Sequence, residues 1–199
     1  MKRLLLATRN PGKVQELTEI LRDLPVEIRS LLDYPAVPDL IEDGTTLEDN
    51  ALKKARVAFE QTQVPSLADD SGLEVFHLNM EPGVRSARYA GEKATYDENN
   101  RKLLDALGDT TPEQRHAQFR CVVAFVAQGI EKFAEGVCPG LIADSPHGDG
   151  GFGYDPVFIP EGFEETFAEL RPEIKNRISH RGIAMQAMME SLSKYFTNK

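Results

Sequence analysis

A short polar turn near the start of the chain has the composition of a phosphate-binding loop. Residues 7–14 read ATRNPGKV, and the P-loop pattern is G-x-x-x-x-G-K-[ST]. Gly12 and Lys13 fit this pattern. Ala7 stands in place of its first glycine, and Val14 in place of its final serine or threonine. The segment is therefore an altered P-loop, a phosphate site of another kind, or an ordinary turn with a solvated lysine.

A second polar segment combines carboxylates with a lysine. Glu42-Asp43-Gly44 precedes a predicted helix that carries Asn50 and Lys54. Lys54 lies on the apolar face of that helix, by its 3.6-residue spacing. A lysine in such a place either extends its ammonium group to water or lies over a buried anion.

Two adjacent carboxylates lie in an apolar stretch, LADDSG, at residues 67–72. On a strand, Asp69 and Asp70 point to opposite faces, so one of them at most faces a given pocket. Mg²⁺ is commonly held by one or two carboxylates together with substrate phosphates. The alternative is an Asx-turn formed by Asp-Ser-Gly.

Two later segments combine glycine, aromatic and basic residues. GGFGYDP, at 150–156, brings backbone and aromatic rings together, and a ring stacked on a base contributes about 1–3 kcal/mol. The alternative is a loop fixed by one buried aromatic residue. KNRISHRG, at 175–182, is a basic segment in an acidic chain, and its alternative is an exposed turn that caps the final helix. Its basic residues are Lys175, Arg177, His180 and Arg181.

The elements that must position these residues alternate between strand and helix, with a hairpin later in the chain, which favours an α/β fold with a mixed sheet. The first unit, strand–turn–helix, directs backbone N–H groups and the helix dipole at one place. Either Thr45 or Thr46 caps the second helix by its spacing. The periodicity predicts strands over 4–6, 66–78 (interrupted or bent at 69–72), 119–127 and 132–137, and helices from 14, from about 45, over 95–107 and over about 183–196.

Length, charge and cysteine content limit the class of protein. The 199 residues, 41% of them hydrophobic, predict one globular domain over 1–199. A net charge of −9 without a basic run argues against nucleic acid polymers and anionic membranes as partners, but allows a small phosphorylated ligand. Two cysteines form no zinc or disulfide pattern, and the N-terminal apolar run is too short for a signal peptide. We therefore expect a cytoplasmic protein.

Together these segments supply what a nucleoside triphosphate needs, and their sequences resemble one known family. LATRNPGKVQEL, LADDSGLEV, PGVRSARYAG, GGFGYDPVF and KNRISHRG are similar, in order and over nearly the whole chain, to the inosine triphosphate pyrophosphatase family, also called XTP/dITP diphosphatases. The resemblance implies hydrolysis of ITP, dITP and XTP to the monophosphate and pyrophosphate, with Mg²⁺, by a homodimer. It also implies an elongated mixed β-sheet flanked by helices, with two lobes around a central cleft.

The resemblance assigns roles to individual positions. Asp70 matches the catalytic proton acceptor, which also binds the metal together with Glu42, and Lys13 takes part in catalysis. The substrate-binding positions are Thr8, Arg9, Asn10, Pro11, Gly12, Lys13, Lys54, Ser71, Phe152, Gly153, Tyr154, Asp155, Lys175, His180 and Arg181, with Ser179 in the last motif.

The sequence departs from the family pattern at three places. Ile41 stands where a further acidic residue is common, so Asp69 or water would complete the metal site. Arg9 replaces a small residue, and it either contacts phosphate or points outward. Residues 172–174 replace a more acidic, helical stretch, which would shift Lys175.

The hypothesis for specificity rests on the 6-keto group of the purine. Donors from Arg181, His180 or the backbone near Phe152 would bind O6, and they would oppose the amino group of adenine. Two other functions remain open. A P-loop NTPase would release orthophosphate, and a non-catalytic purine nucleotide sensor would bind without turnover.

Overall fold

The computed structural model describes residues 2–197, and its contacts group the chain into two compact units. The predicted central cleft remains a prediction. Unit 1 is drawn from Met1–Asp70, Cys121–Gly136 and Arg181–Lys199, and unit 2 from Ser71–Arg120 and Val137–His180. Three long strands contribute residues to both units: β3 (Ser66–Val75), β5 (His116–Ala127) and β6 (Ile130–Ile142).

The strands form one sheet in the order β2-β1-β3-β5-β6-β7, with β4 paired to β3. Strand β1 (Arg3–Leu6) runs parallel to both β2 (Glu27–Ser30) and β3. Strands β4 (Glu81–Pro82) and β7 (Phe158–Pro160) pair antiparallel with β3 and β6. Parallel and antiparallel pairs in one sheet, with helices beside it, confirm the predicted mixed α/β architecture.

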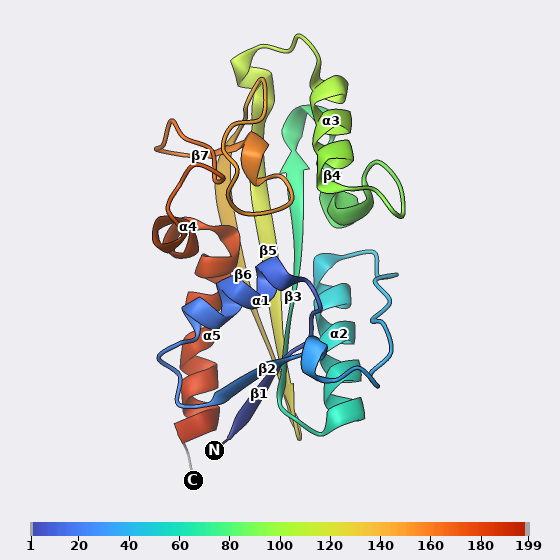
Figure 1. Ribbon diagram of the computed structural model, residues 1–199, viewed down its shortest axis with the longest axis vertical. Coiled ribbons are helices and arrows are strands. Elements are labelled where there is room, and N and C mark those ends of the chain that lie inside the picture. The colour runs from blue at the N-terminus through green and yellow to red at the C-terminus, as the bar shows by residue number, and fades with distance from the viewer. Residues whose placement is uncertain (1, 198–199) are drawn as a thin grey trace. The chain divides into compact units, whose positions relative to one another are not determined.

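In unit 1, helices cover both faces of the strands. Figure 1 shows α5 (His180–Thr197) and α2 (Leu47–Thr62) on opposite sides of β1 and β3. Leu4 and Leu6 belong to a core cluster with residues of α1 (Pro11–Ile20) and α5. Leu5 is also fully buried, and the alternation of a strand directs it to the other face, where α2 lies.

Unit 2 has a second core, to which α3 (Tyr96–Leu107) contributes. Aromatic rings dominate it: Phe119 and Phe158 meet edge to face at 4.7 Å between centroids, and Phe167 lies 5.1 Å from Phe158. Helix α4 (Pro172–Ile178) also belongs to this unit. The remaining buried members of the cluster are Leu73, Val75, Leu103, Leu107, Ala117, Cys138, Ile142, Tyr154 and Val157.

Short-range signals in the sequence placed several boundaries correctly. Thr46, rather than Thr45, caps α2, because its side chain accepts from the Asp49 amide. Thr95 and Glu98 form the predicted capping box of α3. Gln128-Gly129 joins β5 to β6 as expected, with Gly129 at a φ of 70° that favours glycine.

Other boundaries differ from the prediction. Strand β3 continues unbroken through residues 66–75, so the expected interruption at 69–72 and the Asx-turn alternative are wrong. Helix α1 begins at Pro11 instead of Val14, because Asn10 caps it and proline fits its first position. Helix α5 begins at His180 instead of about Ile183. Residues 172–174 are helical, as the start of α4.

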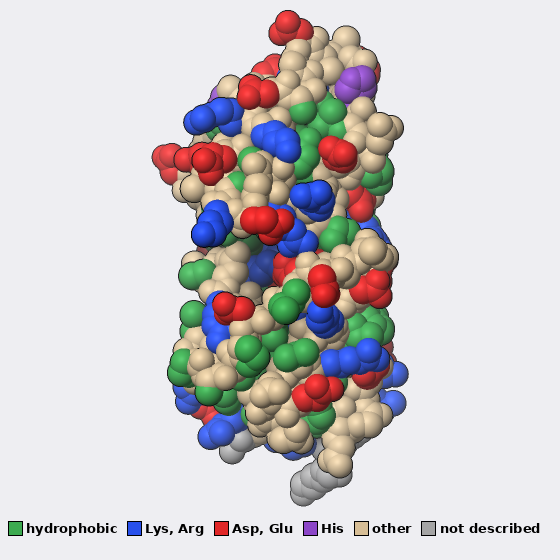
Figure 2. Space-filling view, turned by 90° about the vertical axis from the view of Figure 1, so that its right-hand side faces the viewer, with side chains coloured by type: hydrophobic (Ala, Val, Ile, Leu, Met, Phe, Trp, Pro, Cys, Tyr) green, Lys and Arg blue, Asp and Glu red, His purple; other side chains and the backbone are tan. Residues whose placement is uncertain are grey.

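Two further observations concern the surface charges and the helices. Positive and negative side chains are interspersed over the face drawn in Figure 2. Within residues 2–197, no helix combines the length and the apolar character that crossing a bilayer requires.

The pairing of β6 with β7 leaves no space for a side chain at Gly140. A Cβ atom there would lie 2.3 Å from the Ile159 carbonyl oxygen and 2.6 Å from the Phe158 ring. We expect Gly140→Ala to lower the free energy of unfolding by about 1–3 kcal/mol and Tm by several degrees. Thermal unfolding followed by circular dichroism measures this. Lys132→Ala, at an exposed position of the same strand, is the control and should leave Tm nearly unchanged; equal Tm values for both variants would contradict the close packing.

Candidate active site

Two adjacent carboxylates on β3 form the centre of the unit 1 site. Asp69 and Asp70 are 3% and 6% exposed, and they point to opposite faces of the strand, as predicted. Asp69 lies 3.1 Å from the Lys13 ammonium nitrogen and accepts from Nε and Nη2 of Arg181 at 3.0 and 2.9 Å. Asp70 turns toward α2, where it accepts from Lys54 at 2.7 Å.

Lys54 connects the carboxylates on its side of the strand. Its Nζ donates at 2.7 Å to Oε1 of Glu42, to Oδ1 of Asp70 and to the backbone oxygen of Asp69. Only 5% of Lys54 is exposed, so the alternative of an ammonium group that extends to water is wrong. Burial alone would lower the pKa of Lys54, but the carboxylates of Asp70 and Glu42 outweigh it and raise that pKa. Lys54 is therefore charged. We call Glu42, Lys54 and Asp70 the carboxylate cluster.

The two aspartates differ in the direction of their pKa shifts. Burial tends to raise the pKa of Asp69, but the positive charges of Lys13 and Arg181 outweigh it, and this pKa lies well below its ordinary value. Burial raises the pKa of Asp70 above its ordinary value, although Lys54 opposes the change. Asp69 is thus held ionised, while Asp70 is the better proton acceptor of the pair.

The turn before α1 uses its backbone donors within the chain. The Asn10 side chain accepts from the amides of Gly12 at 2.9 Å and Lys13 at 3.3 Å, and the Asn10 amide donates to Oγ1 of Thr8 at 3.2 Å. Pro11 has no amide hydrogen. The expectation that these N–H groups point at a phosphate therefore needs correction, because the cap occupies them. The turn can therefore contact an anion through its side chains, among which Lys13 carries the positive charge.

Arg9 is directed to a neighbouring loop. Its Nη2 donates to the backbone oxygens of Val37 at 2.7 Å and Tyr34 at 3.4 Å, and its Nη1 lies 3.7 Å from Asp39. The alternative in which Arg9 merely points outward is wrong. Its contact with phosphate remains a prediction.

Arg181 is buried between two acidic residues of unit 1. Besides Asp69, its guanidinium donates to Oε2 of Glu16 at 2.6 Å, and these two carboxylates raise its pKa despite its burial. Lys175, His180 and Arg181 are each at most 5% exposed, so the exposed basic turn is wrong for them. Glu16 was missed by the sequence analysis; its position three residues after Lys13 on one helix was the available signal.

A second group of predicted residues gathers in unit 2, and we call Phe152, Asp155 and Lys175 the aromatic cluster. Lys175 Nζ lies 5.1 Å from the centroid of the Phe152 ring, within the range of a cation–π contact, and forms an ion pair with Asp155. The Phe152 amide donates to Oδ2 of Asp155 at 2.7 Å. A Cβ at Gly151 would lie 2.0 Å from the same oxygen, so the loop approaches Asp155 this closely because residue 151 is glycine.

The glycine-rich loop is fixed by one buried aromatic residue, while stacking of its other ring on a base stays a prediction. Tyr154 is 4% exposed, and its hydroxyl donates to the Ser86 backbone oxygen at 2.9 Å, so it is the buried aromatic residue that fixes the loop. Asn100 supports the same loop by donating to the Gly153 oxygen at 3.0 Å. Phe152 is only half-buried, which leaves its ring the better candidate for stacking on a base.

The remaining predicted residues of unit 2 lie on its strands and helices. Ser71 is half-buried in β3. The His180 ring stacks on Phe119 at 4.5 Å between centroids and 12° between planes. Ser179 is buried at the end of α4, where its amide donates to the Lys175 oxygen.

The carboxylate cluster is compatible with a divalent cation. Glu42 and Asp70 each place an oxygen 2.7 Å from the same Lys54 nitrogen, so these oxygens are at most twice that distance apart. Within residues 2–197, no three His, Cys, Asp or Glu side chains are grouped to hold a metal ion. Two carboxylates fit Mg²⁺, which usually completes its shell with water and substrate phosphate oxygens.

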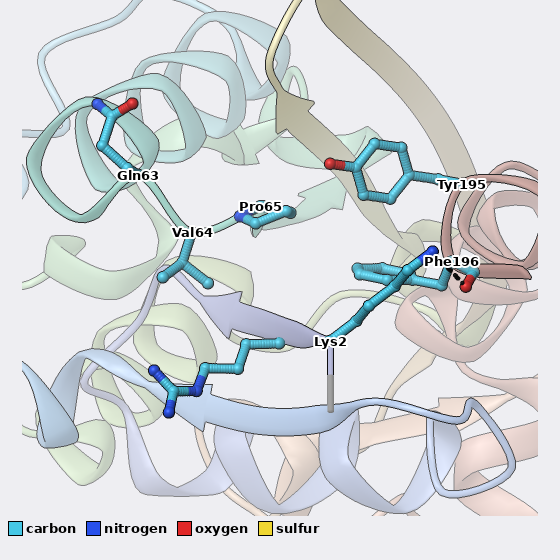
Figure 3. A pocket seen from close by; sticks show the side chains of 7 residues that line it. Lys2, Gln63, Val64, Pro65, Tyr195 and Phe196 are labelled. Atoms are coloured by element: carbon cyan, nitrogen blue, oxygen red, sulfur yellow. Dashed lines mark hydrogen bonds between the residues drawn. The ribbon is translucent and has the colours of Figure 1, made fainter. Parts of the chain in front are cut away.

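Unit 1 also has a pocket with a different set of lining residues. Figure 3 shows its lining, with the Tyr195 ring and the Pro65 ring directed into the space and Lys2 donating to the Phe196 backbone oxygen. None of its lining residues is a predicted site residue, so it contributes nothing to the site above. The lining comprises Lys2, Arg3, Gln63, Val64, Pro65, Tyr195 and Phe196.

Comparison with known proteins gives consistent matches over almost the full length. Residues 4–191 match the profile of the Ham1 family. A protein named dITP/XTP pyrophosphatase from Geobacter sulfurreducens is 49% identical, over 96% of this chain and 97% of that protein. A protein of the same name from Thermoanaerobacter pseudethanolicus is 45% identical, over 99% of this chain and 100% of that one.

Solved structures agree with these matches. A HAM1 protein from Coxiella burnetii superposes with a TM-score of 0.86 at 42% identity, covering 98% of this chain and 100% of that one. A structure described as nucleoside-triphosphatase / dITP/XTP pyrophosphatase from Mycobacterium abscessus gives 0.74 at 45% identity, covering 94% and 98%.

The buried charge of Asp69 has a consequence for stability. Removing one partner of a buried ion pair costs about 3–5 kcal/mol, so we expect Asp69→Asn to be destabilised by this amount at pH 7. The folded pKa of Asp69 lies below its unfolded value of about 3.9, so its contribution is complete above about pH 5 and is lost as the pH falls below that value. The difference in the free energy of unfolding between the variant and the wild type, measured with denaturant, should therefore shrink from pH 5 to pH 3. Asp23→Asn, at an exposed site, is the control; a difference that grows at pH 3 would contradict this.

Proposed function

The chain belongs to the Ham1 family, and on this premise we propose that it hydrolyses non-standard purine nucleoside triphosphates. The substrates are dITP, XTP and ITP, and the products are the nucleoside monophosphate and pyrophosphate. Relatives matched over their full length are named for dITP and XTP. The observation that carries the proposal is the buried carboxylate of Asp70, held 2.7 Å from Lys54 beside Glu42.

The residues of unit 1 supply the hydrolytic chemistry in this proposal. Lys13 and Lys54 offset the negative charge of the triphosphate. Asp70 orients the attacking water and accepts its proton, and its raised pKa suits this role better than that of an ordinary aspartate. Glu42 and Asp70 would hold Mg²⁺, which supplies charge stabilisation at the phosphate oxygens when bound. Positioning and electrostatics provide most of the catalysis in such transfers.

The residues of unit 2 supply base recognition in this proposal. Phe152 stacks on the purine, and Lys175, which has three donor hydrogens, can bind O6 while it keeps its ion pair with Asp155. A donor facing O6 would oppose the amino group of adenine, and an unpaired buried donor costs about 1–3 kcal/mol. Arg181 is a weaker candidate for O6, because its guanidinium already binds Asp69 and Glu16.

We also propose that the enzyme is a homodimer in the cytoplasm, with Mg²⁺ as its metal and no nucleic acid or membrane partner. Cys121 and Cys138 are buried as thiols, which is compatible with a reducing compartment. The family match runs through residues of both units, from 4 to 191, which supports a single catalytic domain.

Hydrolysis in H₂¹⁸O identifies the bond that breaks. We expect ITP, dITP and XTP to give the monophosphate and pyrophosphate, with ¹⁸O in the monophosphate, because water attacks the α-phosphorus. Chromatography and mass spectrometry measure both products. The Asp70→Asn variant is expected to lose at least about 100-fold in kcat. Orthophosphate as the product would indicate a γ-phosphatase. Tight binding of ITP without turnover would indicate a nucleotide sensor.

The aromatic cluster predicts a base-dependent effect of Phe152→Ala. Loss of one stacked ring should raise KM for ITP about 5- to 150-fold, which corresponds to about 1–3 kcal/mol. The rate with inorganic triphosphate, which lacks a base, should stay unchanged. Tyr96→Ala is a matched control on the neighbouring ring, 6.2 Å from Phe152, and should have the smaller effect. Equal losses with ITP and inorganic triphosphate would remove Phe152 from base recognition.

A further inference from the structure

We propose that Asn50 is a positioning residue of the hydrolytic centre, whose side-chain amide holds the loop of Glu42 against the carboxylate of Asp70. The inference rests on the proposed function, because it takes Glu42 and Asp70 as working groups of that site. Asn50 itself has no assigned role in substrate or metal binding.

The amide of Asn50 is buried and has a defined orientation. The residue is 1% exposed in the first turn of α2. Its Oδ1 accepts from the Gly44 amide at 2.8 Å, and its Nδ2 donates to Oδ2 of Asp70 at 3.2 Å. A backbone N–H can only donate and an ionised carboxylate can only accept. The amide therefore has one satisfactory orientation, and it connects the two groups through a single side chain.

Asn50 and Lys54 donate to different oxygens of the Asp70 carboxylate. Lys54 donates to Oδ1, whereas Asn50 donates to Oδ2. The two donors are four residues apart on α2, so they lie on the same helical face. Two donors from one rigid helix fix the rotation of the carboxylate plane about its bond to the strand. The Lys54 ammonium alone, which also binds Glu42, would leave that rotation free.

The loop that carries Glu42 depends on the same amide. Residues 38–44 form neither helix nor strand, so side-chain contacts must hold them in place. Gly44 approaches Asn50 so closely that a Cβ there would lie 2.6 Å from its Oδ1 and 2.9 Å from the Cβ of Asp49. Asn50 therefore sets the position of Gly44, two residues after Glu42, at the same time as it holds Asp70.

Three substitutions test this role, two at Asn50 and one at Gly44, which Asn50 contacts. Asn50→Asp keeps the size but places a carboxylate oxygen against Oδ2 of Asp70. Asn50→Ala removes the donor and the acceptor without adding charge. Gly44→Ala pushes the loop away while Asn50 remains intact. Asp49→Asn, an exposed change of similar size in the same helical turn, is the matched control.

Steady-state kinetics with ITP in saturating Mg²⁺, together with thermal unfolding, provide the measurement. Displacement of a working group by about 1 Å costs about 100-fold in rate, so we expect this loss in kcat for Asn50→Asp, and about 10-fold losses for Asn50→Ala and Gly44→Ala. KM for ITP should stay within about threefold of wild type, because the lysines that bind the triphosphate remain. Asp49→Asn should match wild type.

The outcomes separate this inference from the proposed function. Failure of the wild-type protein to release pyrophosphate would refute the function. An active wild type, with folded Asn50→Ala or Gly44→Ala retaining kcat within twofold, would overturn the role of Asn50. A loss confined to KM would also overturn it, because that pattern belongs to substrate binding. If Asn50→Asp does not fold, Asn50→Ala and Gly44→Ala still decide the question through the same split between kcat and KM.

Discussion

Two neighbouring carboxylates are buried on one strand, and each needs a positive partner of its own. An ionised group that is removed from water without a partner is strongly disfavoured. Because β3 alternates its side chains, Asp69 and Asp70 form their direct ion pairs on opposite faces and with different cations. Lys13 and Arg181 approach Asp69 from α1 and α5, and Lys54 approaches Asp70 from α2. This constraint accounts for the charged residues on the inner faces of three helices in unit 1.

The unequal number of partners gives the two carboxylates different properties. Asp69 receives two cations and its pKa falls, whereas Asp70 has one ammonium group, which it shares with Glu42, and its pKa rises. Environments that move two pKa values apart are the usual way in which a site assigns different roles to identical groups. This difference supports the proposal in which Asp69 is a fixed anchor and Asp70 is the group that reacts.

Local features of unit 1 and unit 2 could be predicted from the sequence, whereas contacts between residues far apart in the chain could not. The cap at Thr95 and the opposed faces of Asp69 and Asp70 depend on residues within a few positions. The ion pair of Arg181 with Asp69 joins residues 112 positions apart, which periodicity does not encode. Lys54 was left undecided between water and a buried anion for the same reason, since its partners come from a loop and a strand. The continuity of β3 through Asp-Ser-Gly was missed because turn-forming residues can lie in a strand when their polar groups find partners elsewhere.

The cap of α1 changes how an anion could be bound there. A helix N-terminus attracts phosphate through unpaired N–H groups, but Asn10 accepts from the amides of Gly12 and Lys13. The charge that attracts an anion to this turn is then that of the Lys13 side chain, which is 16% exposed and lies 3.1 Å from Asp69. A phosphate that binds Lys13 competes with Asp69 for its ammonium group. Arg181 donates to the same Asp69 oxygen through two nitrogens, so Lys13 can move to an anion without leaving a buried carboxylate unpaired.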